Sequence, residues 1–309
     1  MGAEEIVKEH WDKMAEEPPK QGTQWVHSQK ILEEINRRVS GDPKVDWMEY
    51  TMARKFFVRH PPEKFSCLSL ACGSGALERG LASTGMFGYI EGIDISEGSI
   101  RIAREEAAKA NLSYVHYLAA DLNHAALEQK KYDVILSASA MHHIKNLEHL
   151  LGQIQKALKP GGTLVLSDFV GPSQFQWTDK QIALMNAMLD RLSPRLRNDI
   201  LNPGTPKPHL GRCSIEHMNK MDPSEAIRAK EIVPLIEERF NIVARKDWGG
   251  TLLHLGLQNI IGNFDENDPT DLSFLSFIIF FEETLIKEKV IESDFTFLVA
   301  SPKRRWLPW

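Results

Sequence analysis

The sequence has few cysteines, no long hydrophobic run and no excess of positive charge. Its three cysteines, Cys67, Cys72 and Cys213, lack metal-ligand spacing, so they argue against a disulfide scaffold and favour a reducing compartment. The most apolar run, residues 274–281, is too short to span a bilayer and fits a buried helix or a contact in a homo-oligomer. The N-terminus is charged, unlike that of a signal peptide. We therefore expect a cytoplasmic protein that does not enter a membrane.

The charge balance excludes one class of partner. The 309 residues carry 37 Lys and Arg against 42 Asp and Glu, a net charge of −5. Binding along DNA or RNA needs clustered positive charge, so no nucleic acid partner is expected. With 42% hydrophobic and 26% charged residues, the composition is that of an ordinary globular protein that is long enough for a large core.

The order of the apolar patterns predicts an α/β fold. Residues 1–62 show helical spacing and indicate a helical N-terminal extension. From residue 63 to 309 we expect one domain, in which short apolar strands alternate with helices as in a parallel sheet. The predicted strands are 66–71, 89–94, 113–119, 132–137, 163–167, 240–246 and 294–300, and the predicted helices are 98–110, 147–158, 178–192, 224–239, 252–263 and 271–290. The proline-rich stretch of about 171–223 breaks this order and predicts an inserted cap over the site.

A turn of tiny residues follows the first predicted strand, in the sequence Leu70-Ala-Cys-Gly-Ser-Gly75. Gly73 and Gly75 allow backbone conformations closed to other residues and leave room for a ligand on the main chain. The turn opens at the carboxyl end of a strand, where open α/β sheets bind ligands. Asp94 lies nineteen residues after Gly75, at the tip of the next strand, where it can accept both hydroxyls of a ribose. The pattern predicts a site for a cofactor that contains a nucleoside.

The details of the turn favour S-adenosylmethionine over a dinucleotide. The dinucleotide fingerprint needs a third glycine three residues after the second, so that the helix can approach a pyrophosphate. Here that position holds Glu78, whose charge would oppose a diphosphate. S-adenosylmethionine has no phosphate and tolerates an acid there. A nicotinamide-dependent oxidoreductase is thus the less favoured alternative.

With these pieces in order, the chain resembles the class I S-adenosylmethionine-dependent methyltransferases over about 65–170 and again over 224–301. The resemblance rests on the glycine loop, Gly92-Ile-Asp-Ile-Ser96, Ala120-Asp-Leu122, Tyr132-Asp-Val-Ile-Leu136 and Leu158-Lys-Pro-Gly-Gly162. It implies a Rossmann-like sheet, mostly parallel with an antiparallel last strand. The helical leader and the cap after strand five look like a bacterial subgroup that acts on small molecules.

The resemblance also implies the cofactor, S-adenosyl-L-methionine with S-adenosyl-L-homocysteine as its product, and the residues that bind it. Asp121 matches the residue that contacts the adenine amino group, with the Leu122 amide near the ring. Ala71 stands where the family usually has Gly, which slightly narrows the cleft. The implied cofactor-binding residues are Ala71, Cys72, Gly73, Ser74, Gly75, Asp94, Ile95, Asp121, Leu122 and Ser137.

Candidates for acid–base chemistry lie at the carboxyl ends of strands four and five. Methyl transfer from a sulfonium is an in-line displacement, and a hydroxyl acceptor gains typically ~10²–10⁴-fold from a general base. His142 and His143 have a suitable pKa for that role, with His142 slightly favoured, and Asp168 is the other candidate. No metal is expected, because adjacent histidines should point in different directions and no carboxylate cluster accompanies them.

Trp25, Gln176 and Trp177 are candidates for the wall of an acceptor pocket, although such tryptophans can also belong to the core. A cap would enclose a modest substrate. We therefore expect methyl transfer to an oxygen or nitrogen of a small molecule, such as a sugar or a secondary metabolite. A non-catalytic S-adenosylmethionine-binding or regulatory protein remains the alternative from another class.

Overall fold

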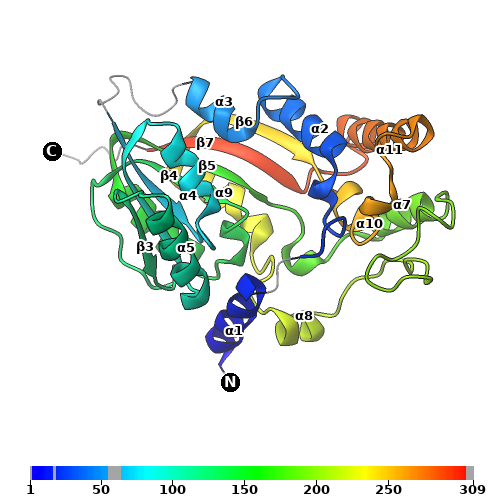
Figure 1. Cartoon of the computed structure of the whole chain (residues 1–309), viewed down its shortest axis with the longest axis horizontal. Coiled ribbons are helices and arrows are strands. Elements are labelled where there is room, and N and C mark those ends of the chain that lie inside the picture. The colour runs from blue at the N-terminus through cyan, green and yellow to red at the C-terminus, as the bar shows by residue number, and fades with distance from the viewer. Residues whose placement is uncertain (1, 17–18, 55–63, 304–309) are drawn as a thin grey trace.

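One seven-stranded sheet forms the centre of the molecule (Figure 1). The computed structural model describes residues 2–16, 19–54 and 64–303. The strand order is β3-β2-β1-β4-β5-β7-β6. The strands are β1 (Phe65–Leu70), β2 (Phe87–Asp94), β3 (Val115–Ala119), β4 (Tyr132–Ala138), β5 (Leu158–Phe169), β6 (Phe240–Gly249) and β7 (Phe295–Pro302). The first five pair in parallel, and β7 runs antiparallel to β5 and β6. This confirms the predicted fold class.

The central strands are continuous apolar runs because helices cover both of their faces. In β4, Val134, Ile135 and Leu136 are completely buried, and Leu164 to Leu166 of β5 are equally buried beside them. β5 is longer than predicted because the Lys159-Pro-Gly-Gly162 turn is continuous with the strand. The core of the molecule therefore lies on the strands whose carboxyl ends carry the predicted site residues.

Four helices pack on the sheet near these strands. They are α4 (Ala76–Ser83) and α5 (Glu97–Lys109) beside β2 and β3, α6 (Leu147–Ala157) beside β5, and α9 (Ile232–Arg239) beside β6 and α6. Ser96 begins α5 by accepting a hydrogen bond from the Ser99 amide, and Asn146 begins α6 in the same way from His149. The predicted helices 98–110 and 147–158 are confirmed.

The remaining helices lie around the edges of the sheet. They are α1 (Ala3–Glu16), α2 (Gln29–Ser40), α3 (Trp47–Arg54), α7 (Asp179–Leu189), α8 (Ile215–Met221), α10 (Leu253–Leu257) and α11 (Pro269–Lys287), with α2 and α11 in contact with β6. Figure 1 shows α2, α7, α10 and α11 gathered at one end of the molecule, whereas α1 lies below the sheet next to α8. A buried ion pair between Arg38 of α2 and Glu282 of α11 joins helices that are far apart in sequence. No helix within the described ranges has both the length and the apolar character needed to cross a membrane.

Two predicted helices differ from the structure. The helix expected over 224–239 begins only at Ile232, after a short 3-10 turn, η4 (Ala229–Glu231). Pro234 then lies in the first helical turn, where its missing N–H costs nothing, whereas a helix from 224 would place it in the interior. The helix expected over 252–263 is divided into α10 and η5 (Ile261–Asn263). The first difference leaves residues 222–228 free to enter the site.

Candidate active site

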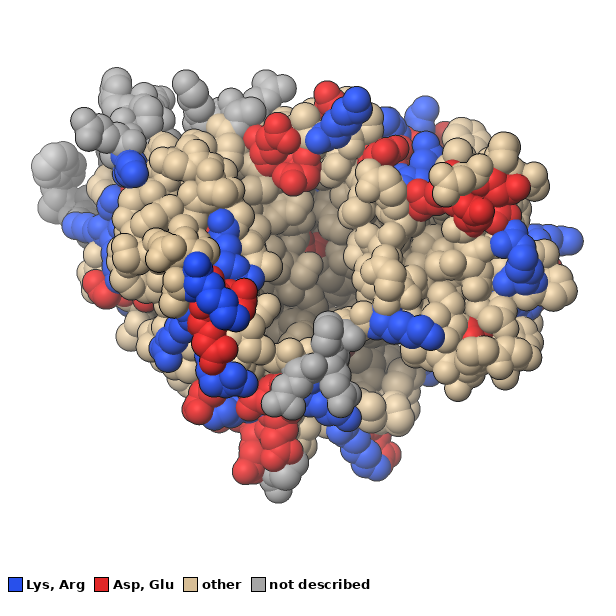
Figure 2. Space-filling view, in the orientation of Figure 1, with Lys and Arg blue, Asp and Glu red and all other residues tan. Residues whose placement is uncertain are grey.

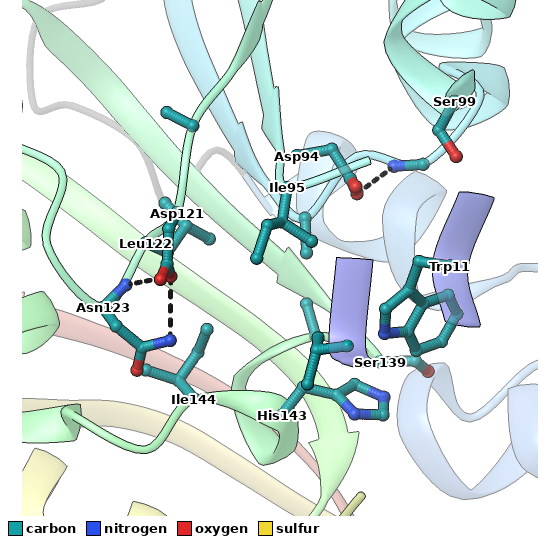
Figure 3. Close-up of a pocket in the computed structure, with 15 residues that line it drawn as sticks. Trp11, Asp94, Ile95, Ser99, Asp121, Leu122, Asn123, Ser139, His143 and Ile144 are labelled. Carbon is teal, nitrogen blue, oxygen red and sulfur yellow. Dashed lines mark hydrogen bonds between the residues drawn. The ribbon is translucent and has the colours of Figure 1, made fainter. Parts of the chain in front are cut away.

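A pocket opens at the carboxyl ends of β1 to β4, where the cofactor was predicted (Figure 3). Six of the ten predicted cofactor residues line it: Ala71, Gly73, Asp94, Ile95, Asp121 and Leu122. The other four do not line this pocket: Cys72, Ser74, Gly75 and Ser137. The structure thus brings the ends of four strands together in one cavity.

The glycine loop takes left-handed backbone conformations at three positions. Gly73 has φ 53° and Gly75 has φ 77°, as expected of glycine, but Ala71 also has φ 47°. A side chain at Gly75 would collide with Tyr117, whose hydroxyl donates a hydrogen bond to the Gly75 carbonyl. A side chain at Gly73 would meet no atom within 4 Å, so there the left-handed backbone, not space, requires glycine. Gly75 therefore shapes the loop, whereas Gly73 faces the pocket.

Asp94 fastens the glycine loop to the end of β2. Its Oδ2 accepts a hydrogen bond from the Gly73 amide, and its Oδ1 accepts one from the Ser96 amide, both at 2.8 Å. Burial raises the pKa of this carboxyl above its ordinary value, although the backbone N–H donors partly oppose that shift. Each oxygen keeps a second lone pair, and the side chain lines the pocket, so the carboxylate can still receive hydroxyl donors.

Asp121 lies at the other end of the pocket from Asp94 (Figure 3). Its Oδ1 accepts hydrogen bonds from the backbone and the side-chain amides of Asn123, each at 2.8 Å. Asn123 in turn accepts from the amides of Lys145 and Asn146, which directly precede α6 in the connection from β4. The loops after β3 and β4 are therefore held together at this end.

Helix α1 forms one wall of the pocket, which was not predicted from the sequence. Val7 and Trp11 line the pocket, and the Trp11 ring meets the edge of the His143 ring at a centroid distance of 4.9 Å. Asp12 holds the helix in place by accepting hydrogen bonds from the Ser96 hydroxyl and the Gly98 amide. This contact joins residues that are more than 80 positions apart, so no local pattern could have predicted it.

Asp168 holds His142 in a fixed orientation. The carboxylate is completely buried; its Oδ1 lies 2.5 Å from His142 Nδ1, and its Oδ2 accepts from the amides of Ala140 and Met141. A carboxylate has no proton to donate, so His142 Nδ1 carries the hydrogen and Nε2 is left as the outward atom. The expectation that Asp168 acts as a base on the acceptor does not fit this burial. We assign it a positioning role.

Glu225 completes this group and was not foreseen. Its Oε1 lies 3.6 Å from His142 Nε2, so carboxylates flank both nitrogens of the ring. Burial alone would lower the pKa of His142, but Asp168 and Glu225 outweigh it and raise that pKa. Burial also raises the pKa of Glu225. The residue lies in the stretch that was expected to be helical, and the sequence offered no sign of its approach to His142.

His143 differs from its neighbour in the direction in which its surroundings shift its pKa. It lines the pocket, its Nδ1 lies 3.2 Å from the Ser224 hydroxyl, and burial holds its pKa well below the ordinary value. The rings of His142 and His143 lie with their centroids 4.0 Å apart. Together with Glu225 they each offer one donor atom within 4.8 Å of the others. The prediction that adjacent histidines would diverge, with no carboxylate beside them, is wrong.

The predicted tryptophans belong to a buried aromatic cluster rather than to the pocket. Trp25 and Trp177 are 4% and 3% exposed, and both rings lie against His254. Phe169 connects this cluster to His142, since its ring meets both His142 and His254. Burial lowers the pKa of His254 to about 4. The aromatic cluster is therefore an apolar, uncharged layer beside His142 and the carboxylates of Asp168 and Glu225.

The side chains of Gln176 and Glu78 do not line the pocket. The Gln176 amide donates to the carbonyls of Gln174 and Cys213 and so fixes the start of the cap. Glu78 is completely buried below the loop, and burial raises the pKa of its carboxyl. Because Glu78 does not line the pocket, its carboxyl does not face a ligand there, contrary to the prediction.

Comparisons with known proteins agree with this geometry. The family described as methyltransferase domain matches residues 63–223, more than half of the chain. An uncharacterized methyltransferase of Mycobacterium bovis is 33% identical over 106 residues, which cover 34% of this chain and 51% of that protein. A ubiquinone biosynthesis O-methyltransferase of Hydrogenovibrio crunogenus is 29% identical over 105 residues, 34% of this chain and 43% of the relative. The chain thus spans about half or less of the length of these relatives.

A solved structure extends the likeness of the fold. The geranyl diphosphate C-methyltransferase of Streptomyces coelicolor A3(2) was solved in complex with Mg²⁺, geranyl diphosphate and S-adenosyl-L-homocysteine. It matches 98% of this chain and 98% of its own with a TM-score of 0.51, at 11% sequence identity. The resemblance expected from the sequence motifs is confirmed: the chain belongs to the family of methyltransferase domains.

Proposed function

We propose that the protein transfers the methyl group of S-adenosyl-L-methionine to an oxygen nucleophile of a small-molecule acceptor. The observation that carries this proposal is a single pocket, lined by Gly73, Asp94 and Asp121, with His143 in its wall and His142 directly behind. A cofactor held by the first three residues would present its sulfonium toward the group at the end of β4.

On this proposal two carboxylates hold the nucleoside part of the cofactor. Asp94 accepts the ribose hydroxyls through the lone pairs that Gly73 and Ser96 leave unused. Asp121 receives the adenine amino group, with the Leu122 amide near the ring. Trp11 covers the cofactor from the side of α1. A charge-assisted hydrogen bond contributes about 1.5–3 kcal/mol, so the two carboxylates should account for much of the affinity.

The acceptor side favours oxygen as the nucleophile. An oxygen loses its proton as it is methylated, and Glu225 and His142 form a titratable pair next to His143, which lines the pocket. Such groups contribute typically ~10²–10⁴-fold to the rate. The name of the Hydrogenovibrio relative, an O-methyltransferase, supports the same choice. We infer a hydroxylated metabolite as the acceptor class.

The surface supports a small acceptor rather than a polymer. Figure 2 shows a hollow near the centre of the molecule, between the end that carries β3 and α5 and the end that carries α10 and α11. Lysine and arginine are mixed with acidic residues around it, without a continuous positive face on this side. Nucleic acid binding would need such a face. We place the reaction in the cytoplasm, as the sequence suggests.

Calorimetric titration with S-adenosyl-L-homocysteine, with NAD as the control ligand, tests the cofactor. Micromolar affinity for the former and none for NAD is expected. The chain is then incubated with isotope-labelled S-adenosyl-L-methionine and a panel of hydroxylated metabolites, and labelled methyl is sought on oxygen by mass spectrometry. Absence of S-adenosyl-L-homocysteine binding contradicts the proposal, and binding of NAD instead supports the oxidoreductase alternative. Binding without transfer to any acceptor supports the non-catalytic alternative.

A further inference from the structure

We propose that His142, His143 and Glu225 bind one divalent transition-metal ion, which in turn binds the oxygen of the acceptor. This inference rests on the proposed function for its chemistry but not for its geometry. The three residues each offer a donor atom within 4.8 Å of the other two, at the wall between the cofactor pocket and the aromatic cluster. Four features of the cluster fit a metal site.

The first feature is the orientation of His142. Asp168, an acceptor, holds the hydrogen of His142 on Nδ1 and leaves the lone pair on Nε2. Histidines that bind metals almost always donate their other ring N–H to such a carboxylate or carbonyl, which fixes the tautomer and the ring plane. Asp168 is itself held by the amides of Ala140 and Met141, so the ring has little freedom to turn away.

His143 is fixed in the same tautomer by a different partner. The Ser224 hydroxyl has one hydrogen, and it donates this to Asp222 Oδ1 at 2.6 Å. The hydroxyl oxygen can therefore only accept from His143 Nδ1, at 3.2 Å. His143 Nε2 is then also without a hydrogen. Each of the two adjacent histidines thus has one ring nitrogen without a hydrogen, as a metal ligand requires.

The position of Glu225 is the third feature. Its Oε1 is 3.6 Å from His142 Nε2, which is too long for a hydrogen bond. Two ligand atoms at about 2.0–2.1 Å from a tetrahedral zinc ion lie about 3.3–3.4 Å apart. The observed separation is close to this spacing and requires only a small movement of the Glu225 side chain, which is 29% exposed.

A buried carboxylate oxygen supplies the fourth, independent observation. Asp222 is 6% exposed, and its Oδ2 has no hydrogen-bond partner among the described residues. It faces His143 Nδ1 at 3.8 Å and His10 Nε2 at 3.9 Å. An unpaired buried oxygen of this kind is costly unless positive charge compensates it. Asp222, Glu225 and Asp168 together surround the histidine pair with negative charge.

The donor set selects the ion and its chemistry. Two imidazoles and one carboxylate suit Zn²⁺, Co²⁺, Mn²⁺ or Fe²⁺ rather than Mg²⁺ or Ca²⁺, which prefer oxygen ligands. An ion held by three protein ligands keeps a position open for the acceptor. Binding of the acceptor hydroxyl releases its proton to solvent; the metal-bound oxygen then attacks the methyl carbon, and the sulfur keeps the electron pair of the broken bond. The products are a methyl ether and a neutral thioether, and the metal does not change its oxidation state.

The test uses the untagged full chain after removal of metals with a chelator. ZnCl₂ alone is titrated by calorimetry, and CoCl₂ is titrated by visible absorption, because tetrahedral Co²⁺ has an intense characteristic spectrum. We expect one equivalent to bind. Glu225→Gln should weaken binding at least tenfold, and Asp168→Asn, which removes no ligand, about 10–100-fold.

A matched control variant distinguishes metal binding at this cluster from metal binding at a surface group. Glu4, Asp121 and His124 form the other group of possible ligands within the described residues, and His124 is largely exposed. His124→Ala should leave the stoichiometry and the Co²⁺ spectrum unchanged. Each variant is checked for an unaltered melting temperature without metal, so that a loss of fold is not mistaken for a loss of ligand.

The outcomes distinguish this inference from the proposed function. No binding to the wild type, or binding that His124→Ala removes and Glu225→Gln does not, overturns the metal site. If S-adenosyl-L-homocysteine binds to the same sample while Zn²⁺ does not, methyl transfer stands and His142 with Glu225 acts without a metal. If Zn²⁺ binds with the expected variants and S-adenosyl-L-homocysteine does not, the metal site stands and the proposed function fails.

Discussion

The cofactor side and the acceptor side of the site are built in different ways. On the cofactor side, Asp94 ends β2, and Gly73 and Asp121 lie in the turns that follow β1 and β3, so the sheet alone brings them together. On the acceptor side, His142 follows β4, Asp168 lies next to the last residue of β5, and Glu225 comes from a turn 57 residues further along the chain. The first group is positioned by strand ends, whereas the second is assembled by long-range contacts.

Because of this difference, substitutions on the two sides of the site should have different effects. Strand ends are fixed by the core, so a substitution on the cofactor side removes a ligand contact and disturbs at most the adjacent turn. The acceptor side depends on hydrogen bonds between segments, so a substitution there disturbs the orientation of several groups. We therefore expect cofactor affinity and turnover to be affected by separate sets of residues.

The largest effect is expected at Glu225. Glu225→Gln keeps the shape of the side chain but removes its charge beside His142. Turnover should fall by ~10²–10⁴-fold, as for the loss of a group that acts on the proton of the acceptor, while S-adenosyl-L-homocysteine affinity changes less than about twofold. Steady-state kinetics and calorimetry measure the two quantities. Glu216→Gln, an exposed residue of α8, is the control and should change neither.

Asp94→Ala should have the reverse effect. The substitution removes the carboxylate that receives the ribose and unfastens the Gly73 amide. Loss of charged hydrogen bonds costs about 1.5–3 kcal/mol, or about 10–100-fold in S-adenosyl-L-homocysteine affinity. Turnover at saturating cofactor should be little changed. Glu105→Ala removes an exposed acid from α5 and should have no effect; equal affinities of Asp94→Ala and wild type would contradict the assignment.

The buried carboxyl of Asp294, outside the cofactor pocket, should affect the stability of the fold but not cofactor affinity. It accepts the Trp177 indole N–H, and burial raises its pKa to about 7. The folded state therefore keeps a proton that the unfolded chain releases above about pH 4, so stability falls as the pH rises from about 4 to 7. Asp294→Asn should be more stable than wild type by about 1–3 kcal/mol at pH 8, and the difference should vanish near pH 4.

Denaturant unfolding at pH 8 and pH 4 measures the difference in free energy of unfolding between Asp294→Asn and wild type. A difference between Asp294→Asn and wild type that does not depend on pH would show that the Asp294 carboxyl does not titrate in this range. S-adenosyl-L-homocysteine affinity should be unchanged in this variant, because the aromatic cluster lies outside the cofactor pocket.

Trp11→Ala tests whether α1 belongs to the cofactor side. The ring lines the pocket and packs on His143, so its removal should weaken S-adenosyl-L-homocysteine binding about five- to tenfold, or about 1–1.4 kcal/mol. Lys13→Ala, at an exposed position of the same helix, is the control. If Trp11→Ala lowers turnover without changing affinity, α1 belongs to the acceptor side instead.

The smallest effect is expected at Ala71. Its left-handed backbone is strained for alanine but not for glycine, so Ala71→Gly should stabilise the fold by up to about 1 kcal/mol. Ala108→Gly, in the last turn of α5, should do the opposite and destabilise by up to about 0.5–1 kcal/mol. Thermal unfolding compares the pair. Destabilisation in both would show that the Ala71 methyl group makes a packing contact that outweighs the strain.

The same difference between the two sides decided which features could be predicted from the sequence. The strands, the glycine loop and Asp94 followed from local patterns, because a strand and the turn after it are encoded by neighbouring residues, and Asp121 followed from the family resemblance. The role of Asp168 depended on its complete burial against His142, and Trp11 and Glu225 depended on contacts across the whole chain. Periodicity does not reveal such contacts. The helix predicted over 224–239 even concealed Glu225, since Pro234 sets the true helix start.

The most direct test of the two-sided site is one set of calorimetric titrations with S-adenosyl-L-homocysteine into wild type, Asp94→Ala and Glu225→Gln. We expect micromolar binding to wild type, about the same affinity for Glu225→Gln, and a loss of about 10–100-fold for Asp94→Ala. No binding to wild type, or equal losses in the two variants, would contradict it.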